Sequence, residues 1–339
     1  MRVDLILEAN NASGRVAELA KLAESYGFGG LWVSNMHDAR DPFINFVQSA
    51  LGTTRISMGP VAVSPYELHP MKMAAALLTL NEISNGRAHI GIAAGAGGAP
   101  TAMGVPQERR LRAVRECVEI LKAACTGKPL RYKGEMFKVL YYHPSYAGGT
   151  PPMIWVCANG PMMLASAARY ADGIFVGDHT PEDIGRMRAI VDAKCAEVGR
   201  SQAGMRFNNF WAWHVKETRE AAHREARRWL AIRATPYPDY YYRDILPEEE
   251  MQVIFANKPA IIKAFNTGSD VIEGIPADIM ERFVDKATSA SGLDDLEREI
   301  DRLRRFKANG LTEISLRIYE NPEWTIKLIG EKVIPALAG

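Results

Sequence analysis

The chain has 339 residues, of which 47% are hydrophobic and 24% are charged, so it can bury a large core. A single α/β barrel commonly uses this length, and we interpret residues 1–339 as one domain. The 41 lysine and arginine residues nearly balance the 40 aspartate and glutamate residues, giving a formal charge of +1. This balance supplies no general attraction for nucleic acid or an anionic membrane, so we expect a small-molecule ligand.

The start of the chain, MRVDLILEANN, reaches Asp4 and Glu8 at once and has no long apolar core. It is therefore neither a secretory signal nor a membrane anchor, and we predict a cytoplasmic location. The cysteines form no CxxC pair, which favours free buried thiols over disulfides or zinc. They are Cys117, Cys125, Cys157 and Cys195.

Short β-rich runs recur along the chain, each followed by a helical pattern, as in a parallel sheet built from βα units. Eight such units predict closure into a (β/α)8 TIM barrel. The predicted strands are Val3–Glu8, Gly30–Ser34, Arg55–Val63, Arg87–Ala93, Pro152–Cys157, Asp172–Gly177, Met205–Val215 and Leu311–Arg317. The predicted helices are Gly14–Tyr26, Pro42–Leu51, Pro70–Ile83, Pro106–Cys125, Pro161–Tyr170, Pro181–Val198, Lys216–Ile232 and Asn321–Leu337.

Two intervals are too long for ordinary barrel loops and are predicted to be insertions near the carboxyl-end mouth. Lys128–Thr150 alternates like a hairpin, whereas Ala234–Gly292 contains the crowded aromatic segment TPYPDYYYRD. Such a segment is often a lid over the catalytic mouth, and an aromatic contact between two subunits is the alternative. The tyrosines predicted to contact substrate are Tyr237, Tyr240 and Tyr241.

The stretch His69–Pro100 predicts a helix, a tight stop, a buried strand and a glycine loop. Its strand Ala88–Ile92 is too apolar to be half exposed, which indicates a sheet covered on both faces. The loop residues Gly95, Gly97 and Gly98 would let a ligand touch the main chain, and an ordinary βα turn is the alternative.

Ligands of βα barrels bind at the carboxyl ends of the strands, where two further segments stand out. Small apolar residues in the run from Val61 to Ser64 suit the face of a ring system, although aliphatic residues here can equally be core. The run CANGPMM enters a helix directly, so its free amide groups predict an anion site, with a simple capped turn as the alternative. The cofactor-binding candidates in these segments are Val61, Ala62, Val63, Ser64, Ala158, Asn159, Gly160, Pro161, Met162 and Met163.

Few ionisable residues follow the predicted strands. Glu8 ends the first strand, and a carboxylate facing an apolar mouth can have a raised pKa, a salt-bridged structural role being the alternative. His37 follows the second strand and can act as an acid or base near neutral pH. The histidines show neither HExxH nor HxH spacing, so no metal site is predicted. The absence of GxGxxG, GxxxxGK[ST] and GxSxG disfavours Rossmann, P-loop and α/β-hydrolase domains.

Five segments in order resemble the bacterial-luciferase-like superfamily of flavin and deazaflavin oxidoreductases. They are ELAKLAESYGFGGLWVS, GPVAVSPYELHP, LNEISNGRAHIGIAAGAGG, GPMMLASAARYADGIFVG and GLTEIS. The resemblance spans nearly the whole chain except the two insertions. Within the superfamily the chain is most similar to the methylenetetrahydromethanopterin reductase branch.

This resemblance implies a barrel with an isoalloxazine-type ring at its carboxyl end, and a homodimer. It implies a bulge after the third strand that often holds a non-prolyl cis peptide, here at Val61-Ala62 or Ala62-Val63. The phosphate contacts of the family map onto Asn159–Met163 and Gly95–Gly98. Its acidic residue and histidine after the second strand map onto Asn35-Met36, so the usual hydrogen bond to the ring and the usual acid are missing.

The resemblance favours an oxidoreductase that moves a hydride between bound 8-hydroxy-5-deazaflavin (coenzyme F-420) and a small organic substrate under the tyrosine segment. In this hypothesis Asn35 hydrogen-bonds the ring, while Glu8 or His37 serves the substrate. An FMN-dependent monooxygenase is the alternative, disfavoured because the first arginine after the glycine loop is Arg109. The third hypothesis is a flavin-binding protein without catalytic turnover.

Overall fold

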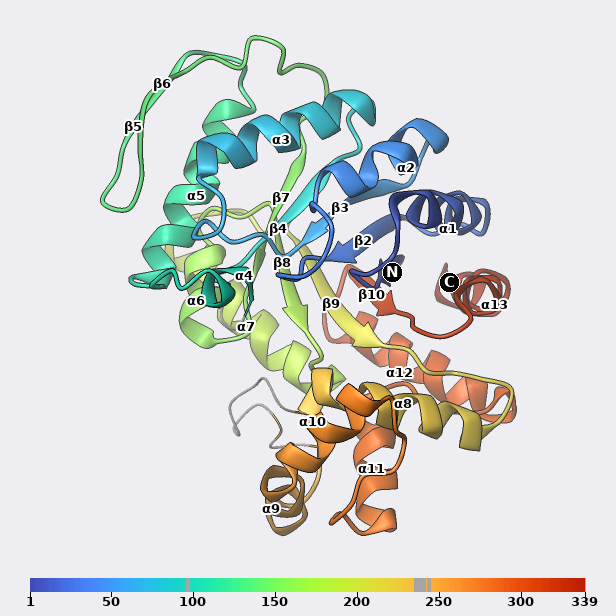
Figure 1. Cartoon of the computed structure of the whole chain (residues 1–339). Helices are drawn as coiled ribbons and strands as arrows, with labels where there is room; N and C mark the ends of the chain where they lie inside the picture. Colours follow the sequence, from blue (N-terminus) through green and yellow to red (C-terminus); the bar gives the residue numbers. More distant parts are fainter. Residues whose placement is uncertain (96–97, 235–241, 243–244, 339) are drawn as a thin grey trace.

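A computed structural model describes residues 1–95, 98–234, 242 and 245–338. Eight parallel strands form a nearly closed barrel surrounded by helices, which confirms the predicted TIM barrel (Figure 1). The barrel strands are β1 (Arg2–Leu7), β2 (Gly30–Ser34), β3 (Ser57–Val61), β4 (His89–Ile92), β7 (Met153–Cys157), β8 (Gly173–Gly177), β9 (Arg206–Ala212) and β10 (Glu313–Arg317).

The barrel closes between β3 and β4, the two ends of the sheet order β3-β2-β1-β10-β9-β8-β7-β4. Isolated parallel bridges join the two strands, and Val63 N donates to Gly91 O at 2.8 Å. At Gly59 any larger residue would collide, since an added Cβ would lie 1.7 Å from His89 O. The glycines of these strands therefore allow the backbones to meet.

Helices follow the strands in chain order and cover the barrel from outside. They are α1 (Ser13–Ser25), α2 (Val47–Gly52), α3 (Pro70–Ile83), α4 (Ala99–Ala102), α5 (Arg110–Ala124), α6 (Pro161–Ala167), α7 (Pro181–Glu197), α8 (Arg219–Ala234), α12 (Leu296–Ala308), α13 (Pro322–Leu328) and α14 (Ile334–Ala338). No helix in the described part of the chain is long and apolar enough to span a bilayer.

Three predicted helices were too long or too continuous. The helix expected at Pro42–Leu51 is a 3-10 turn, η1 (Ile44–Phe46), followed by the short α2. The helix expected from Pro106 begins only at Arg110, because Arg109 adopts a left-handed φ of 50° that interrupts the helical path. The final predicted helix contains a π-helical turn, η4 (Ile329–Val333), between α13 and α14.

The first insertion is a hairpin, as predicted, with β5 (Leu130–Lys133) antiparallel to β6 (Lys138–Tyr142). It leaves the barrel after α5 and before β7. The hairpin tip contacts the middle of α5, where the Glu116 carboxylate accepts the backbone N–H groups of residues 135–137 at 2.9–3.0 Å.

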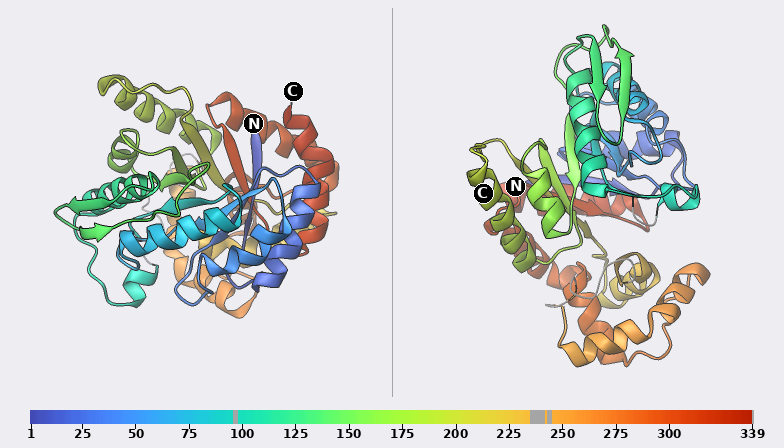
Figure 2. Two further views of the ribbon diagram at one scale, coloured as in Figure 1. Left: turned by 90° about the horizontal axis from the view of Figure 1, so that it is seen from above. Right: turned by 90° about the vertical axis from the view of Figure 1, so that its left-hand side faces the viewer.

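The second insertion contains three helices, α9 (Glu248–Ala256), α10 (Lys258–Thr267) and α11 (Ala277–Ala287), which pack with α8 around a core of their own. Figure 2 shows this group together on one side of the barrel. Tyr242 is fully buried in that core, and its hydroxyl donates to Arg233 O at 3.0 Å. Tyr242 therefore anchors the end of this segment in the core of the insertion, whereas the predicted substrate tyrosines 237, 240 and 241 lie outside the described residues.

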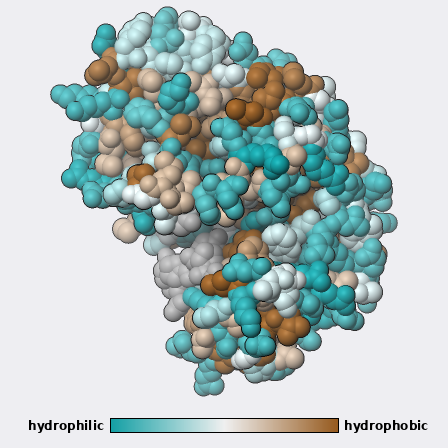
Figure 3. All heavy atoms as spheres, in the orientation of Figure 1, coloured by the Kyte–Doolittle hydropathy of each residue, from teal (hydrophilic) through white to brown (hydrophobic). Residues whose placement is uncertain are grey.

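The barrel interior is filled by aromatic side chains rather than open. Trp32 stacks on His89 with ring centroids 3.5 Å apart and meets Trp155 and Phe175 edge to face. Hydrophobic side chains between strands and helices form a second, larger core, while the outer face is mainly hydrophilic (Figure 3). Because these aromatic side chains fill the interior, a ligand must bind at an end of the barrel.

Candidate cofactor site and active site

The predicted ring-binding segment follows β3 as a bulge. The peptide bond Val61-Ala62 is cis, at the first of the two predicted positions. Asn35, at the end of the neighbouring strand, holds the bulge, because its backbone N–H donates to Val61 O at 2.9 Å and its Nδ2 donates to Ala62 O at 3.1 Å. The half-buried Val61 and Ala62 thus present a fixed backbone at the barrel mouth.

A carboxylate that the sequence analysis missed completes this support. One oxygen of Glu67, Oε1, accepts from Asn35 Nδ2 at 2.7 Å and from Ser64 N at 2.8 Å. Burial raises the pKa of Glu67, although both hydrogen bonds oppose that shift. The signal was present in the sequence as the capping-box spacing Ser64-x-x-Glu67. Both amide hydrogens of Asn35 are therefore engaged, which leaves only its Oδ1 to meet a ring.

The glycine loop after β4 lies against the same bulge. Gly95 has a φ of 82°, and a Cβ there would lie 2.7 Å from Ser64 Oγ. The Ser64 hydroxyl donates to Ala94 O at 3.2 Å and so connects the bulge to the loop. Only glycine suits the positive φ and the close contact at position 95. Gly98 follows three residues later in the same loop. Gly97 lies outside the described residues.

The turn after β7 forms the third part of the mouth. Asn159 Oδ1 accepts the Gly177 N–H at 2.9 Å, which connects the end of β7 to the end of β8. Ala158 is buried behind the turn, and helix α6 then begins at Pro161 without a side-chain cap at Gly160. The amides of Met162 and Met163 are therefore available at the helix start, where anions are favoured. The helix is shorter than predicted, ending at Ala167.

Glu8 takes the salt-bridged alternative rather than facing an apolar mouth. Its carboxylate receives two hydrogen bonds from Arg317 at the end of β10, through Nε and through Nη2, the latter at 2.8 Å. Burial would lower the pKa of Arg317, but the facing carboxylate outweighs it and raises that pKa. The Arg317 guanidinium also lies 5.0 Å from the centroid of the Phe210 ring. Sequence reasoning missed Arg317, whose only signal was an inward strand position after Glu313 and Ser315.

A buried carboxylate, that of Asp178, follows β8. Its φ is 61°, and burial raises its pKa against the opposing charges of Arg233 and Arg317. Arg233 Nε lies 3.8 Å from Asp178 Oδ1 and donates to Ala287 O at 2.8 Å. The two Nη atoms of Arg233 have no hydrogen-bond partner among the described residues. Most buried N–H donors in proteins have a hydrogen-bond partner, so the two Nη atoms of Arg233 are unusual. The interior at this end of the barrel is therefore unusually polar.

His37, in contrast, is exposed on the loop after β2, next to the 47% exposed Met36. The structure does not bring it into the buried pair of Glu8 and Arg317. Among the described residues no group of three or more His, Cys, Asp or Glu side chains is arranged to hold a metal ion. The four cysteines are free, and two of them, Cys117 and Cys195, are buried.

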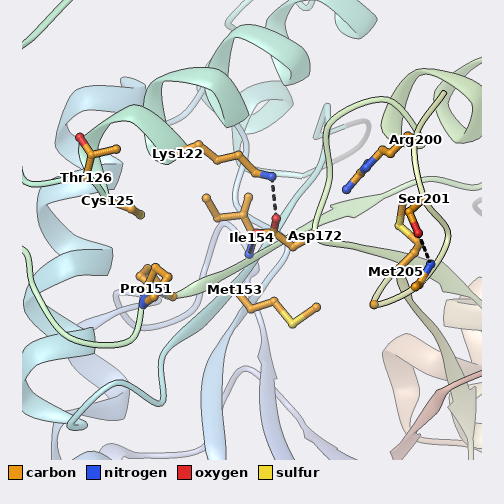
Figure 4. Close-up of a pocket in the computed structure, with 13 residues that line it drawn as sticks. Lys122, Cys125, Thr126, Pro151, Met153, Ile154, Asp172, Arg200, Ser201 and Met205 are labelled. Atoms are coloured by element: carbon orange, nitrogen blue, oxygen red, sulfur yellow. Dashed lines mark hydrogen bonds and ion pairs between the residues drawn. The ribbon is translucent and has the colours of Figure 1, made fainter. Parts of the chain in front are cut away.

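A cavity of about 670 Å³ opens at the opposite end of the barrel, at the amino-terminal ends of β7, β8 and β9 (Figure 4). Its charged groups are already paired: Lys122 Nζ lies 2.6 Å from Asp172 Oδ1, and Arg200 donates to the carbonyl of Ala168 at 2.8 Å. Since ligands of this fold bind at the carboxyl ends, we place the active site at the mouth and not in this cavity.

Known proteins with similar sequences belong to a family that the chain was expected to resemble. The family model described as luciferase-like monooxygenase matches residues 2–309. The 5,10-methylenetetrahydromethanopterin reductase of Archaeoglobus fulgidus is 30% identical over 320 residues, covering 94% of each chain. The corresponding reductase of Methanolobus tindarius is 26% identical and covers 94% of this chain and 95% of its own.

Solved structures share the fold. The coenzyme F420 dependent tetrahydromethanopterin reductase from Methanopyrus kandleri superposes with a TM-score of 0.82 at 23% identity, covering 99% of both chains. An F420-dependent secondary alcohol dehydrogenase in complex with an F420-acetone adduct gives 0.78 at 18% identity with the same coverage. The oxygenating constituent of 3,6-diketocamphane monooxygenase from Pseudomonas putida, in complex with FMN, gives 0.69 at 18% identity, covering 99% of this chain and 98% of its own.

Proposed function

The chain belongs to the luciferase-like monooxygenase family and is an oxidoreductase, and we propose that it moves a hydride between bound 8-hydroxy-5-deazaflavin (coenzyme F-420) and a small organic substrate. One observation supports this most directly. A fixed bulge, a glycine loop and an uncapped helix start meet at the mouth, while the relatives similar along their full length are named as reductases.

The residues at the mouth fit a planar ring with an anionic side chain. Ala62 and Gly95 are small, and a Cβ at Gly95 would fill the space next to Ser64. The bulge can therefore support one face of a ring with backbone and small side chains. The start of α6 offers amides to a phosphate, as the family resemblance implies for Asn159–Met163.

The bound cofactor would supply the redox chemistry, while the protein would supply binding, orientation and electrostatics. Two hydrogen bonds from Arg317 hold the Glu8 carboxylate in place, so it can accept a hydrogen bond from substrate. Asn35 orients the bulge through Ala62 and can offer the ring only its carbonyl oxygen. Exposed His37 remains a candidate only for proton exchange with solvent at the rim.

An FMN-dependent monooxygenase is the second candidate, and one observation favours it. The family model that matches residues 2–309 is described as luciferase-like monooxygenase. Two structural neighbours with this fold are described in complex with FMN and with an F420-acetone adduct, respectively.

Cofactor titration distinguishes these functions. The purified chain is mixed without oxygen with oxidised F-420 or with FMN, and the absorption and fluorescence of each cofactor are followed. We expect tighter binding of F-420, and reduction or oxidation of that bound cofactor when a suitable small organic substrate is added. Binding of FMN alone, with oxygen uptake on reduction, would establish the second candidate. Binding of a cofactor without turnover of any tested substrate would favour the hypothesis of a non-catalytic flavin-binding protein.

Two expectations from the sequence belong to the same proposal. A homodimer is implied by the resemblance and is measured by light scattering of the purified chain. The role of the tyrosine segment is measured by substituting Tyr237, Tyr240 and Tyr241 together with phenylalanine. A lid that contacts substrate predicts a higher KM with unchanged cofactor affinity, whereas a subunit contact predicts a change in mass.

A further inference from the structure

Arg233, near the end of α8, is a buried arginine that leaves most of its hydrogen-bond donors unused. Its side chain is 3% exposed, and its Nε donates to the carbonyl of Ala287 at 2.8 Å. Neither Nη1 nor Nη2 has a hydrogen-bond partner within the described part of the chain. Taking a guanidinium out of water without replacing its hydrogen bonds is costly, so these two atoms call for an acceptor.

The neighbouring carboxylate of Asp178 does not use these donors. Asp178 Oδ1 lies 3.8 Å from Arg233 Nε, beyond hydrogen-bond distance, and has no hydrogen-bond partner of its own among the described residues. Burial raises the pKa of Asp178, which weakens it as a counter-charge. Arg317, the other arginine that acts on Asp178, is paired with Glu8. Arg233 is thus the cation of this group that lacks a hydrogen-bonded carboxylate.

The strand order places Arg233 on the half of the mouth away from the proposed cofactor site. The strands β1, β10, β9 and β8 are consecutive neighbours in the barrel. Glu8, Arg317 and Asp178 therefore form a row along adjacent strand ends, and Arg233 lies beside the last of them. The bulge, the glycine loop and the start of α6 follow β3, β4 and β7, which form the other half of the ring. A substrate that faces the cofactor would therefore lie against the row that Arg233 ends.

We propose that Nη1 and Nη2 of Arg233 bind a carboxylate of the substrate, so that the substrate is an organic acid, an inference that rests on the proposed function. The two nitrogens can donate to both oxygens of one carboxylate in the planar fork that arginine offers. Charge-assisted hydrogen bonds of this kind are strong in a site shielded from water. An acid held by Arg233 extends along the row of strand ends towards Glu8.

A carboxylate suits this site better than a phosphate ester. The single guanidinium matches the charge of a monoanion, whereas a phosphate monoester carries about −1.5 to −2 at pH 7. The Asp178 side chain, 3.8 Å from Arg233 Nε, would oppose the second negative charge. The site therefore selects an anion of one negative charge with two oxygens in a plane.

Three variants separate this role from the general effect of a buried charge. Arg233→Met removes the guanidinium and keeps an unbranched side chain, whereas Arg233→Lys keeps the charge and loses the fork. Arg302→Met on α12 is the matched control. The guanidinium carbons of Arg233 and Arg302 lie 5.6 Å and 5.7 Å from the centroid of the same Trp211 ring. The Nη atoms of Arg302, however, already donate to the carbonyls of Asp285 and Thr288.

The probes are acetate, propionate and benzoate, their uncharged amides, and inorganic phosphate. Each is titrated by calorimetry into the whole chain, with and without F-420, at constant ionic strength. We expect at least one carboxylate to bind about tenfold more tightly than its amide, because only the carboxylate accepts from both Nη atoms with a full charge. Arg233→Met should abolish this preference, Arg233→Lys should reduce it about threefold or more, and Arg302→Met should leave it unchanged.

Equal affinity of the unmodified protein for every acid and its amide would overturn the inference, and so would tighter binding of phosphate than of any carboxylate. An equal loss of preference in Arg233→Met and Arg302→Met would also overturn it, since the effect would then reflect any buried arginine. If Arg233→Met does not fold, Arg233→Lys decides, because an unchanged preference in the folded lysine variant excludes the fork. Binding of F-420 without a preference for carboxylates contradicts this inference alone, whereas failure of F-420 to bind contradicts the proposed function.

Discussion

The carboxylate of Glu8 and the guanidinium of Arg317 join the ends of β1 and β10, although they are 309 residues apart in sequence. Their contact, 2.8 Å between Oε2 and Nη2, lies at the carboxyl end of the barrel, where substrates of this fold react. Two hydrogen bonds from one guanidinium hold the Glu8 carboxylate in a single orientation. The pair therefore fixes the position of the candidate base.

Replacing Glu8 with glutamine should lower turnover on the order of a hundredfold, because a positioned proton acceptor contributes about 10²–10⁴ in rate. The amide keeps one hydrogen bond to Arg317, so cofactor affinity should change little. Steady-state kinetics and cofactor titration of the same preparation measure the two quantities. Full turnover in Glu8→Gln would leave the Glu8–Arg317 pair with a structural role only.

His37→Ala is the complementary variant. The side chain is exposed and no described contact holds it near the buried pair, so turnover should fall by less than about threefold. A hundredfold loss with cofactor still bound would instead show that the loop after β2 carries His37 to the substrate, and would restore it as the acid of the reaction.

The sequence predicted the barrel because each strand is a short apolar run between turn residues, and the bulge because its small residues match the family pattern. The sequence could not predict the hydrogen-bond partners of the polar side chains in the site. The Asn35 amide is used by Ala62 and Glu67, a fact that depends on the path of the loop between them. In the sequence, Arg317 has no feature that distinguishes it from any other residue at the end of a strand. Its contact with Glu8 depends on the pairing of β1 with β10 in the barrel. Element boundaries failed where one residue, such as Arg109, leaves the helical conformation.

Ala62→Phe should weaken cofactor binding by about tenfold or more, equivalent to about 1.4 kcal/mol, because its ring would occupy the space proposed for the cofactor. Ala196→Phe, at an exposed position of α7, is the control for adding a large aromatic side chain. Dissociation constants from fluorescence titration provide the comparison. If folded Ala62→Phe binds the cofactor as well as the control does, the ring lies elsewhere.

Gly160→Asp should weaken binding of a phosphorylated cofactor selectively. The new carboxylate would stand at the start of α6, where the helix dipole and free amides favour a phosphate, and would repel it. Titration with FMN and with riboflavin, which lacks the phosphate, separates this effect from a change in the ring site. Riboflavin affinity should stay the same; parallel losses for both ligands would place the phosphate away from α6.

The last prediction concerns acid stability and a carboxylate outside the site. Glu24, near the end of α1, accepts the backbone N–H groups of Thr54, Arg55 and Ile56 at 2.6–3.0 Å, which fixes α1 to the segment before β3. Although burial acts in the opposite direction, these hydrogen bonds lower the pKa of Glu24 to about 2 from an ordinary value of 4.5. In the unfolded chain the group takes up its proton near the ordinary value, so its contribution to stability is complete above about pH 4.5 and disappears as the pH falls towards 2.

Glu24→Gln should therefore lower the urea midpoint of unfolding at neutral pH, and the difference from the unmodified protein should shrink steadily between pH 4.5 and 2. Glu18→Gln is the matched control, since Glu18 lies on the same helix and its exposed side chain pairs with Arg15. Urea titrations at a series of pH values, each followed by circular dichroism, measure the difference. A difference that stays constant across this range would mean that the folded protein does not depend on the charge of Glu24, and that the lost hydrogen-bond geometry alone accounts for the effect.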